Sequence, residues 1–97
     1  MDRFIRGSFC LDWDVTDMEA WEAKHMKQLE KVGEYCNMFD IEFQCGTTEH
    51  DRYIIEYRII ATTAQRCNSL YRELRDLLKE YFDKPEELVQ FRGRYMR

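Results

Sequence analysis

Residues 53–61 read Tyr-Ile-Ile-Glu-Tyr-Arg-Ile-Ile-Ala, and this stretch decides the fold. Its odd positions hold only tyrosine, isoleucine and alanine, whereas its even positions mix Ile54 and Ile60 with Glu56 and Arg58. Successive side chains of a strand point to opposite faces of a sheet. The stretch therefore predicts a strand with one apolar face, which we expect beneath helices, and one mixed face suited to contact.

Similar patterns extend outward in both directions. Alternating apolar residues predict three further strands, and apolar residues every three or four positions predict two helices. The expected strands are Arg3–Trp13, Asp40–Cys45, Tyr53–Thr62 and Leu88–Met96, and the expected helices are 16–39 and 63–82. Thr16 and Glu19 have the spacing of a capping box, so the first helix is expected to begin there.

The last segment admits two interpretations. Pro85 and the acids after it are typical of a helix start, and a helix would align Leu88, Phe91 and Tyr95. Residues 88–96 also alternate, and Gly93 would fall inside the helix. The strand is the preferred interpretation, with the helix left open.

With a final strand, the order of elements is βαββαβ. This order is typical of an α+β, ferredoxin-like fold: a four-stranded antiparallel sheet, in spatial order 4-1-3-2, with two helices on one face. The chain of 97 residues has room for one such domain, residues 1–97.

Composition limits the classes of function. The net charge is −4, which argues against a general nucleic-acid binder. No apolar run approaches the roughly 20 residues of a membrane helix, and residues 1–7 lack the apolar core of a signal peptide, so we expect a soluble, cytoplasmic protein away from membranes. The four cysteines lack the close spacing of metal or redox motifs and are expected as reduced thiols. We expect no cofactor.

The mixed face of the sheet is the leading candidate site. Apolar side chains interspersed with arginines are typical of protein interfaces. The residues expected on this face as partner contacts are Phe4, Arg6, Ile54, Arg58, Ile60, Arg92 and Arg94, and Cys10, Glu56 and Leu88 are expected beside them. We therefore expect a non-catalytic, protein-binding or regulatory module, such as an adaptor, subunit or inhibitor of a larger complex. It would act through its open sheet face or a sheet edge, as a homodimer.

A metal-dependent nuclease is the alternative from another class. Asp12, Asp14, Asp17 and Glu19 cluster where the first strand meets the first helix, and carboxylates there, with Asp12 and Asp14 as the ligands, would suit Mg²⁺. The chain resembles small ferredoxin-like nucleases in length, strand order and an Asp at the end of the first strand. That resemblance implies a cation-assisted phosphodiesterase. The purely structural interpretation is a helix cap and a solvated strand face.

Two further features bear on function. RNA-recognition folds share this strand order and stack bases on exposed aromatics, but here the open face of the central strands offers only Phe4 among aromatics. RNA binding on that face remains a second alternative. His25 lies on the apolar stripe of the first helix, where a core histidine that donates to a backbone carbonyl is expected rather than a catalytic base.

Overall fold

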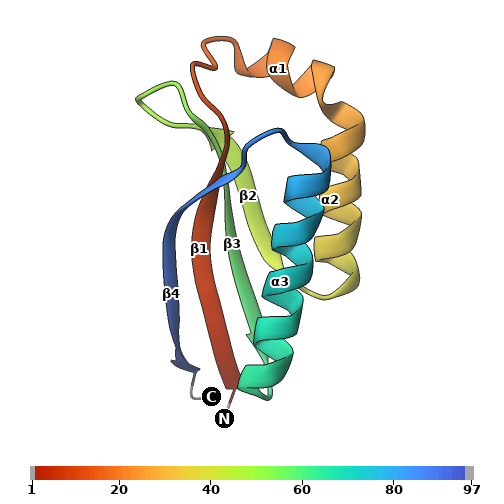
Figure 1. Cartoon of the computed structure of the whole chain (residues 1–97), viewed down its shortest axis with the longest axis vertical. Helices are drawn as coiled ribbons and strands as arrows, with labels where there is room; N and C mark the ends of the chain where they lie inside the picture. Colours follow the sequence, from red (N-terminus) through yellow and green to blue (C-terminus); the bar gives the residue numbers. More distant parts are fainter. Residues whose placement is uncertain (1, 96–97) are drawn as a thin grey trace.

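The computed structural model describes residues 2–95. Along the chain the elements are β1 (Asp2–Asp12), α1 (Met18–Lys24), α2 (Met26–Met38), β2 (Glu42–Thr47), β3 (Tyr53–Ala61), α3 (Ala64–Tyr81) and β4 (Glu86–Tyr95). The helices lie on one side of the sheet, to the right in Figure 1, and no helix of residues 2–95 lies on the other side. This is a two-layer α+β arrangement.

The sheet is antiparallel, with the strands in the order β2-β3-β1-β4. Read from the other edge, this is the expected order 4-1-3-2, and it gives the ferredoxin-like βαββαβ arrangement. The segment after Pro85 is a strand, β4, so the helical interpretation of that segment is wrong. Met96, the expected end of this strand, lies outside the described residues.

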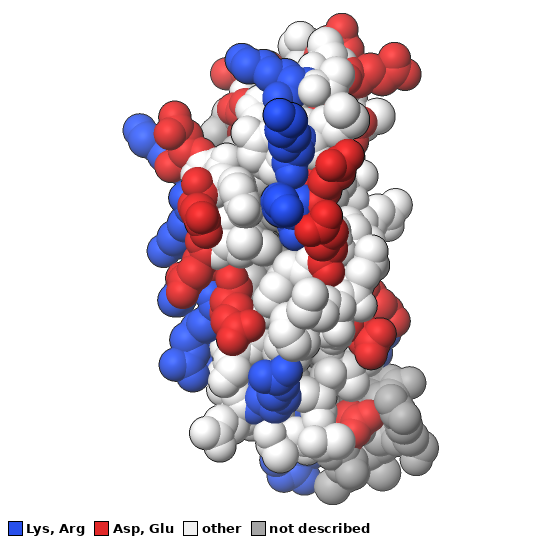
Figure 2. All heavy atoms as spheres, turned by 90° about the vertical axis from the view of Figure 1, so that its right-hand side faces the viewer, with Lys and Arg blue, Asp and Glu red and all other residues white. Residues whose placement is uncertain are grey.

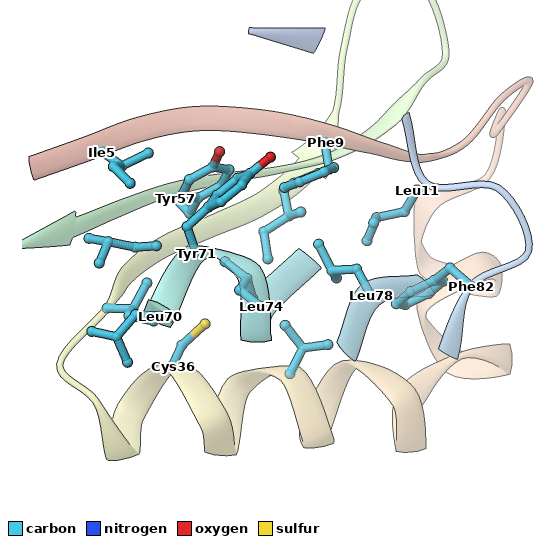
Figure 3. Packing of buried hydrophobic residues seen from close by; sticks show 14 of the residues in the cluster. Ile5, Phe9, Leu11, Cys36, Tyr57, Leu70, Tyr71, Leu74, Leu78 and Phe82 are labelled. Carbon is cyan, nitrogen blue, oxygen red and sulfur yellow. The ribbon is translucent and has the colours of Figure 1, made fainter. Parts of the chain in front are cut away.

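The apolar face of β3 lies beneath the helices, as its sequence predicts. Tyr53, Ile55, Tyr57 and Ile59 are all buried. Ile5 and Phe9 of β1 pack beside them, and α3 closes the layer. Figure 3 shows Phe9, Tyr57 and Tyr71 between the sheet and α3, with Leu74 and Leu78 continuing the cluster along the helix. The remaining labelled members of the cluster are Leu11, Cys36, Leu70 and Phe82.

The expected single helix from Thr16 to Phe39 is wrong. It breaks at His25 into α1 and α2, so the described residues form three helices rather than two. At His25 the backbone leaves helical geometry, with φ −107° and ψ 18°. The His25 ring stacks on Trp21, with centroids 4.2 Å apart, and Trp21 in turn stacks on Tyr53 at 4.0 Å. The break lets α1 turn across the end of β3.

The start of α1 also differs by one residue from the expectation. The capping residue is Asp17, whose carboxylate accepts a hydrogen bond from the backbone N–H of Ala20 at 3.1 Å. The expected box of Thr16 and Glu19 is therefore wrong, although the acidic N-cap satisfies a first-turn N–H in the same way, one residue further on.

The outer surface of the helix layer carries interspersed charges of both signs, which Figure 2 shows from the helix side of the molecule. Lys31 and Glu34 of α2 form one exposed ion pair there, with 3.6 Å between nitrogen and oxygen. Exposed pairs of this kind contribute little to stability. Among residues 2–95, no helix has the length and apolar character needed to cross a membrane.

Candidate functional site

The face of the sheet opposite the helices, here called the open face, is defined by the strand register. Side chains of paired residues in an antiparallel sheet lie on the same face. On the two central strands the pairs are Phe4 with Ile60, Arg6 with Arg58, Ser8 with Glu56 and Cys10 with Ile54. The outer strands add Glu42, Gln44 and Gly46 from β2 and Val89, Phe91 and Gly93 from β4.

Five of the seven residues expected as partner contacts share this open face. They are Phe4, Arg6, Ile54, Arg58 and Ile60. Arg6 is exposed and the other four are half-buried. The alternation of β1 and β3 thus brings them onto one surface, as the sequence predicts, although their role in binding stays a prediction.

Arg92 and Arg94 do not lie on the open face, so this part of the expectation is wrong. The Arg92 guanidinium donates to the Asn68 side-chain oxygen of α3 at 2.8 Å and lies 5.8 Å from the centroid of the Tyr71 ring. Arg94 lines a hollow with Ala64 and Asn68 of α3. Both side chains therefore belong to the helix side.

The register of β4 explains the reversal. Arg6 pairs with Phe91 and Phe4 pairs with Gly93, so even positions of β1 share a face with odd positions of β4. The register shifts between Ser8 and Phe9, so that Leu88 has no paired residue on β1 and lies at a bulge. Leu88 was expected on the open face. Alternation within β4 was visible in the sequence, but its register against β1 was not.

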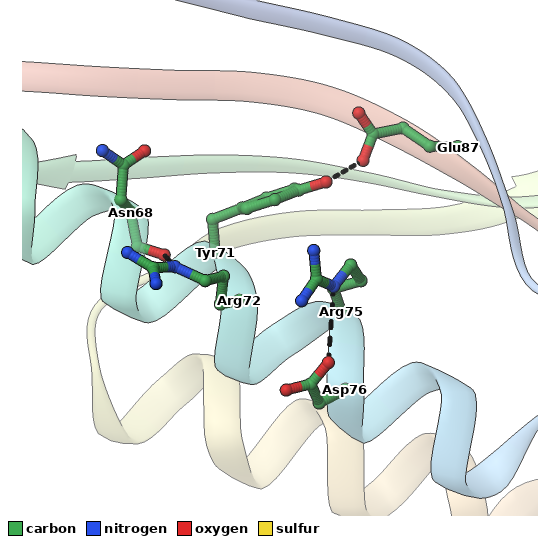
Figure 4. A network of polar contacts seen from close by, with 6 residues as sticks. All are labelled: Asn68, Tyr71, Arg72, Arg75, Asp76 and Glu87. Atoms are coloured by element: carbon green, nitrogen blue, oxygen red, sulfur yellow. Dashed lines mark hydrogen bonds and ion pairs between the residues drawn. The ribbon is translucent and has the colours of Figure 1, made fainter.

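Polar contacts hold β4 to α3 on the helix side. The Tyr71 hydroxyl donates to the Glu87 carboxylate, and Figure 4 shows the ring reaching from the helix toward that strand. Arg72 and Arg75 of the same helix make local contacts with the Asn68 carbonyl and with Asp76. The Tyr71–Glu87 and Arg92–Asn68 bonds thus join α3 to the strand that carries Phe91.

Phe91 and Val89 are the residues that sequence reasoning missed. Phe91 is 53% exposed and Val89 62% exposed. The rings of Phe91 and Phe4 lie with centroids 5.8 Å apart. The available signal was the alternation of Val89, Phe91 and Gly93, which did not say which face it would occupy.

Gly93 makes room for this aromatic pair. A Cβ at Gly93 would lie 2.8 Å from the Phe4 ring, closer than side chains approach one another. The ring of Phe4 therefore lies directly over the backbone of β4. The result is an apolar surface that runs from the central strand β1 onto the strand β4.

Charged groups border these rings. The Arg6 guanidinium lies 5.9 Å from the centroid of Phe91, and that of Arg58 lies 5.9 Å from the centroid of Phe4. Arg58 also faces Glu42 across the β2–β3 pair, 4.0 Å from nitrogen to oxygen. Arginine over an aromatic face gains from the ring quadrupole as well as from packing.

The open face is gently hollowed. A hollow of about 410 Å³ is lined by Arg6, Gly7, Ser8, Glu56, Val89 and Phe91, and one of about 270 Å³ extends from it toward β2. Arg6 and Glu56 line both hollows. The surface suits the side chains of a partner better than a small ligand that must be enclosed.

Cys10 was expected to be exposed on this face, and that expectation is wrong. It is completely buried, and its thiol donates to the Asp12 carbonyl at 3.2 Å. The register shifts between Cys10 and Asp12, so the end of β1 curls over its own thiol. Burial raises the pKa of Cys10, which keeps the thiol protonated and unreactive at neutral pH.

The acidic cluster at the end of β1 has a structural role. The two carboxylate oxygens of Asp12 accept hydrogen bonds from the backbone N–H of Trp13 at 2.8 Å and the indole N–H of Trp21 at 2.7 Å. Asp17 caps α1. Among residues 2–95, no three His, Cys, Asp or Glu side chains come together in a way that would hold a metal ion.

His25 contacts the backbone as expected. Its Nδ1 lies 2.9 Å from the Trp21 carbonyl oxygen, an acceptor, so the proton sits on Nδ1. The half-buried ring lines a polar hollow of about 450 Å³ with Asp12, Trp13, Gln28 and Lys84. Its nearest ring contacts are Trp21 and Phe82, which fits a packing role.

Comparison with known proteins bears on the fold alone. No protein-family model matches the sequence, and no curated protein matches it. A solved structure described as structural-genomics protein YJCS is similar over 99% of this chain and 100% of its own, with a TM-score of 0.61 and 15% identity. A dimeric ferredoxin-like protein from an uncultured marine organism aligns over 100% of this chain and 94% of its own, with a TM-score of 0.46 and 15% identity. The similarity to YJCS supports the α+β fold described above.

Proposed function

We propose that this protein is a protein-binding module whose contact surface is the open face. The observation that carries the proposal is the apolar strip formed by Phe4, Phe91 and Val89, with Ile60 beside Phe4, on the sheet face that no helix among residues 2–95 covers. Contiguous exposed apolar surface of this kind marks interaction sites. Arg6 and Arg58 beside the rings add the residue type enriched at protein interfaces.

The face is favoured over a sheet edge as the contact surface. The edge strand β2 has only six residues, and β4 carries a bulge at Leu88. Short edges and bulges are the devices by which proteins discourage strand addition.

RNA binding is the second candidate, because Phe4 and Phe91 together offer two aromatic rings beside Arg6. The charges on the face weigh against it. Glu42 and Glu56 lie on the same surface as the two arginines, and the whole chain carries a net charge of −4. Such a surface lacks the cationic field that recruits a phosphate backbone.

Photo-crosslinking in cells tests the proposal directly. A benzoylphenylalanine replaces Phe91, and in a matched control it replaces Met38, which is 73% exposed but belongs to α2 on the helix side. We expect protein adducts from position 91 at least about fivefold above those from position 38. Adding Ile54→Lys should remove most of them, because a charged side chain on the same face opposes desolvation.

Three results contradict the proposal. Adducts of equal yield from both positions indicate contact without specificity, and an absence of adducts from position 91 removes the surface. The third result is the release of the adducts by ribonuclease, together with salt-sensitive binding of a labelled single-stranded RNA by the purified protein. It would show that the surface binds RNA rather than protein.

A further inference from the structure

The open-face residues of β3 form a self-complementary row. In order along the strand they are Ile54, Glu56, Arg58 and Ile60: apolar, acidic, basic, apolar. When a second copy of this row lies antiparallel on the first, Ile54 meets Ile60 of the other copy and Glu56 meets Arg58. A two-fold axis across the strand, level with Tyr57, produces this match.

The same axis gives compatible contacts along the other strands. Because of the register, Arg6 faces Ser8 of the second copy, Phe91 faces Val89, and Glu42 faces Gln44. Apolar side chains thus meet apolar ones at β4, and none of these pairs joins like charges. Stacked sheets cross at about 30°, so the match holds best at the central strands.

Three neighbouring two-fold arrangements bring like charges together. Moving the axis by one residue to the level of Arg58 sets this arginine on its own copy, and moving it to Glu56 does the same with two glutamates. An axis parallel to the strands, between β1 and β3, sets Arg6 on Arg58 of the second copy. Like charges in direct apposition are strongly unfavourable in an interface.

We propose that the partner of the open face is a second copy of this chain, stacked sheet on sheet about a two-fold axis level with Tyr57. This inference rests on the proposed function, since it names the partner of the same surface. Each interface then contains the Glu56–Arg58 pair twice, as symmetry requires. Arg58 has five N–H donors, so it can keep its contact with Glu42 while it binds the second copy's Glu56.

Charge reversal in two separate chains tests the arrangement. In Glu56→Lys, the introduced lysine faces Arg58 of its copy; in Arg58→Glu, the introduced glutamate faces Glu56. We expect each variant to self-associate at least about tenfold more weakly than the wild type in sedimentation equilibrium, since the repulsion occurs twice. A mixture of the two variants should recover most of the association. In the mixed pair the introduced lysine faces the introduced glutamate, and at the symmetry-related contact the native Arg58 faces the native Glu56.

Matched controls come from the helix layer. Lys31→Glu and Glu34→Lys reverse charges in an exposed ion pair of α2 and should leave self-association unchanged, alone or mixed. If the reversed β3 variants do not fold, the variants Glu56→Cys and Arg58→Cys, each adding one cysteine to the four native ones, replace them, and the unmodified chain under the same oxidation serves as the control. Under mild oxidation, mixing these two should give disulfide-linked mixed pairs in excess over like pairs.

The outcomes separate this inference from the proposed function. A wild-type chain that stays monomeric at about millimolar concentration, or variants whose mixture recovers nothing, overturns the two-fold arrangement. If photo-crosslinks from position 91 to other proteins persist in that case, the open face remains a contact surface with another partner. If those crosslinks are also absent, both proposals fail.

Discussion

At the scale of single residues, Gly7 shows how closely the strands and the core fit. It lies on the helix-side face of β1, opposite Tyr57 of β3 and next to β4. A Cβ at this position would overlap the Val89 carbonyl oxygen and lie 2.7 Å from the Tyr57 hydroxyl. The backbone atom cannot move without disturbing the β1–β4 pairing.

We predict that Gly7→Ala lowers the free energy of unfolding by about 1–3 kcal/mol, since an added methyl group overpacks a dense core. Urea unfolding followed by circular dichroism measures the change. Gly46→Ala is the matched control, because a Cβ there meets nothing within 4 Å, and it should change the free energy by less than about 0.5 kcal/mol. Equal effects of the two substitutions would argue against the packing described for Gly7.

At the scale of elements, the helix layer departs from what local helix propensity predicts. α1 ends after Lys24, where the sequence continues a helical pattern, and the stack of Tyr53, Trp21 and His25 lies at this break. The opposite case is Gly33, which lies inside α2 although glycine disfavours helices. A Cβ at Gly33 would lie 3.6 Å from the Phe43 ring, an ordinary contact distance.

Gly33→Ala is therefore expected to raise the free energy of unfolding by about 0.5–1 kcal/mol, through lower backbone entropy in the unfolded chain. Thermal and urea unfolding measure it. Thr63→Ala should change stability in the opposite direction. The Thr63 hydroxyl oxygen caps α3 by accepting a hydrogen bond from the Arg66 backbone N–H at 3.1 Å, and its loss should lower the free energy of unfolding by about 1 kcal/mol. Destabilisation by Gly33→Ala would mean that Phe43 leaves less room than its distance indicates.

At the scale of the whole molecule, burial of thiols makes the fold sensitive to alkali. Burial, followed by the charge of Cys45, raises the pKa of Cys36 from 9.0 to about 12. Burial, followed by the charge of Glu22, raises the pKa of Cys45 to about 11. Both groups are neutral acids in the folded state, and the unfolded chain releases their protons first.

The sign of the pH dependence follows from this order. Below pH 9 both thiols are protonated in the folded and the unfolded state, so their full contribution to stability is present. Above pH 9 the unfolded state binds fewer protons than the folded state, so the free energy of unfolding falls until the pH passes the folded pKa. Between pH 8 and pH 10 we expect a loss on the order of 1 kcal/mol per thiol, measured by urea unfolding. Cys36→Ala should flatten this slope, and an unchanged slope would show that Cys36 does not carry it.

The sequence by itself determined the strand order, the buried face of β3 and five of the seven expected contact residues. The odd positions of β3 are all apolar, and this leaves one way to bury two tyrosines and two isoleucines together. The same reasoning located β4 but assigned Arg92 and Arg94 to the wrong side. The alternation in β4 shows which of its side chains share a face, but it does not show which of the two faces lies toward the helices.

Only the tertiary structure decided the remaining features, because they depend on contacts between distant segments. The register of β4 against β1, with its bulge at Leu88, placed Phe91 on the open face. The stacking of Trp21 on Tyr53, more than thirty positions further along the chain, lies beside the break in the first helix. Such pairings have no local signal, since their energy arises from packing that exists only once the sheet and helices have met.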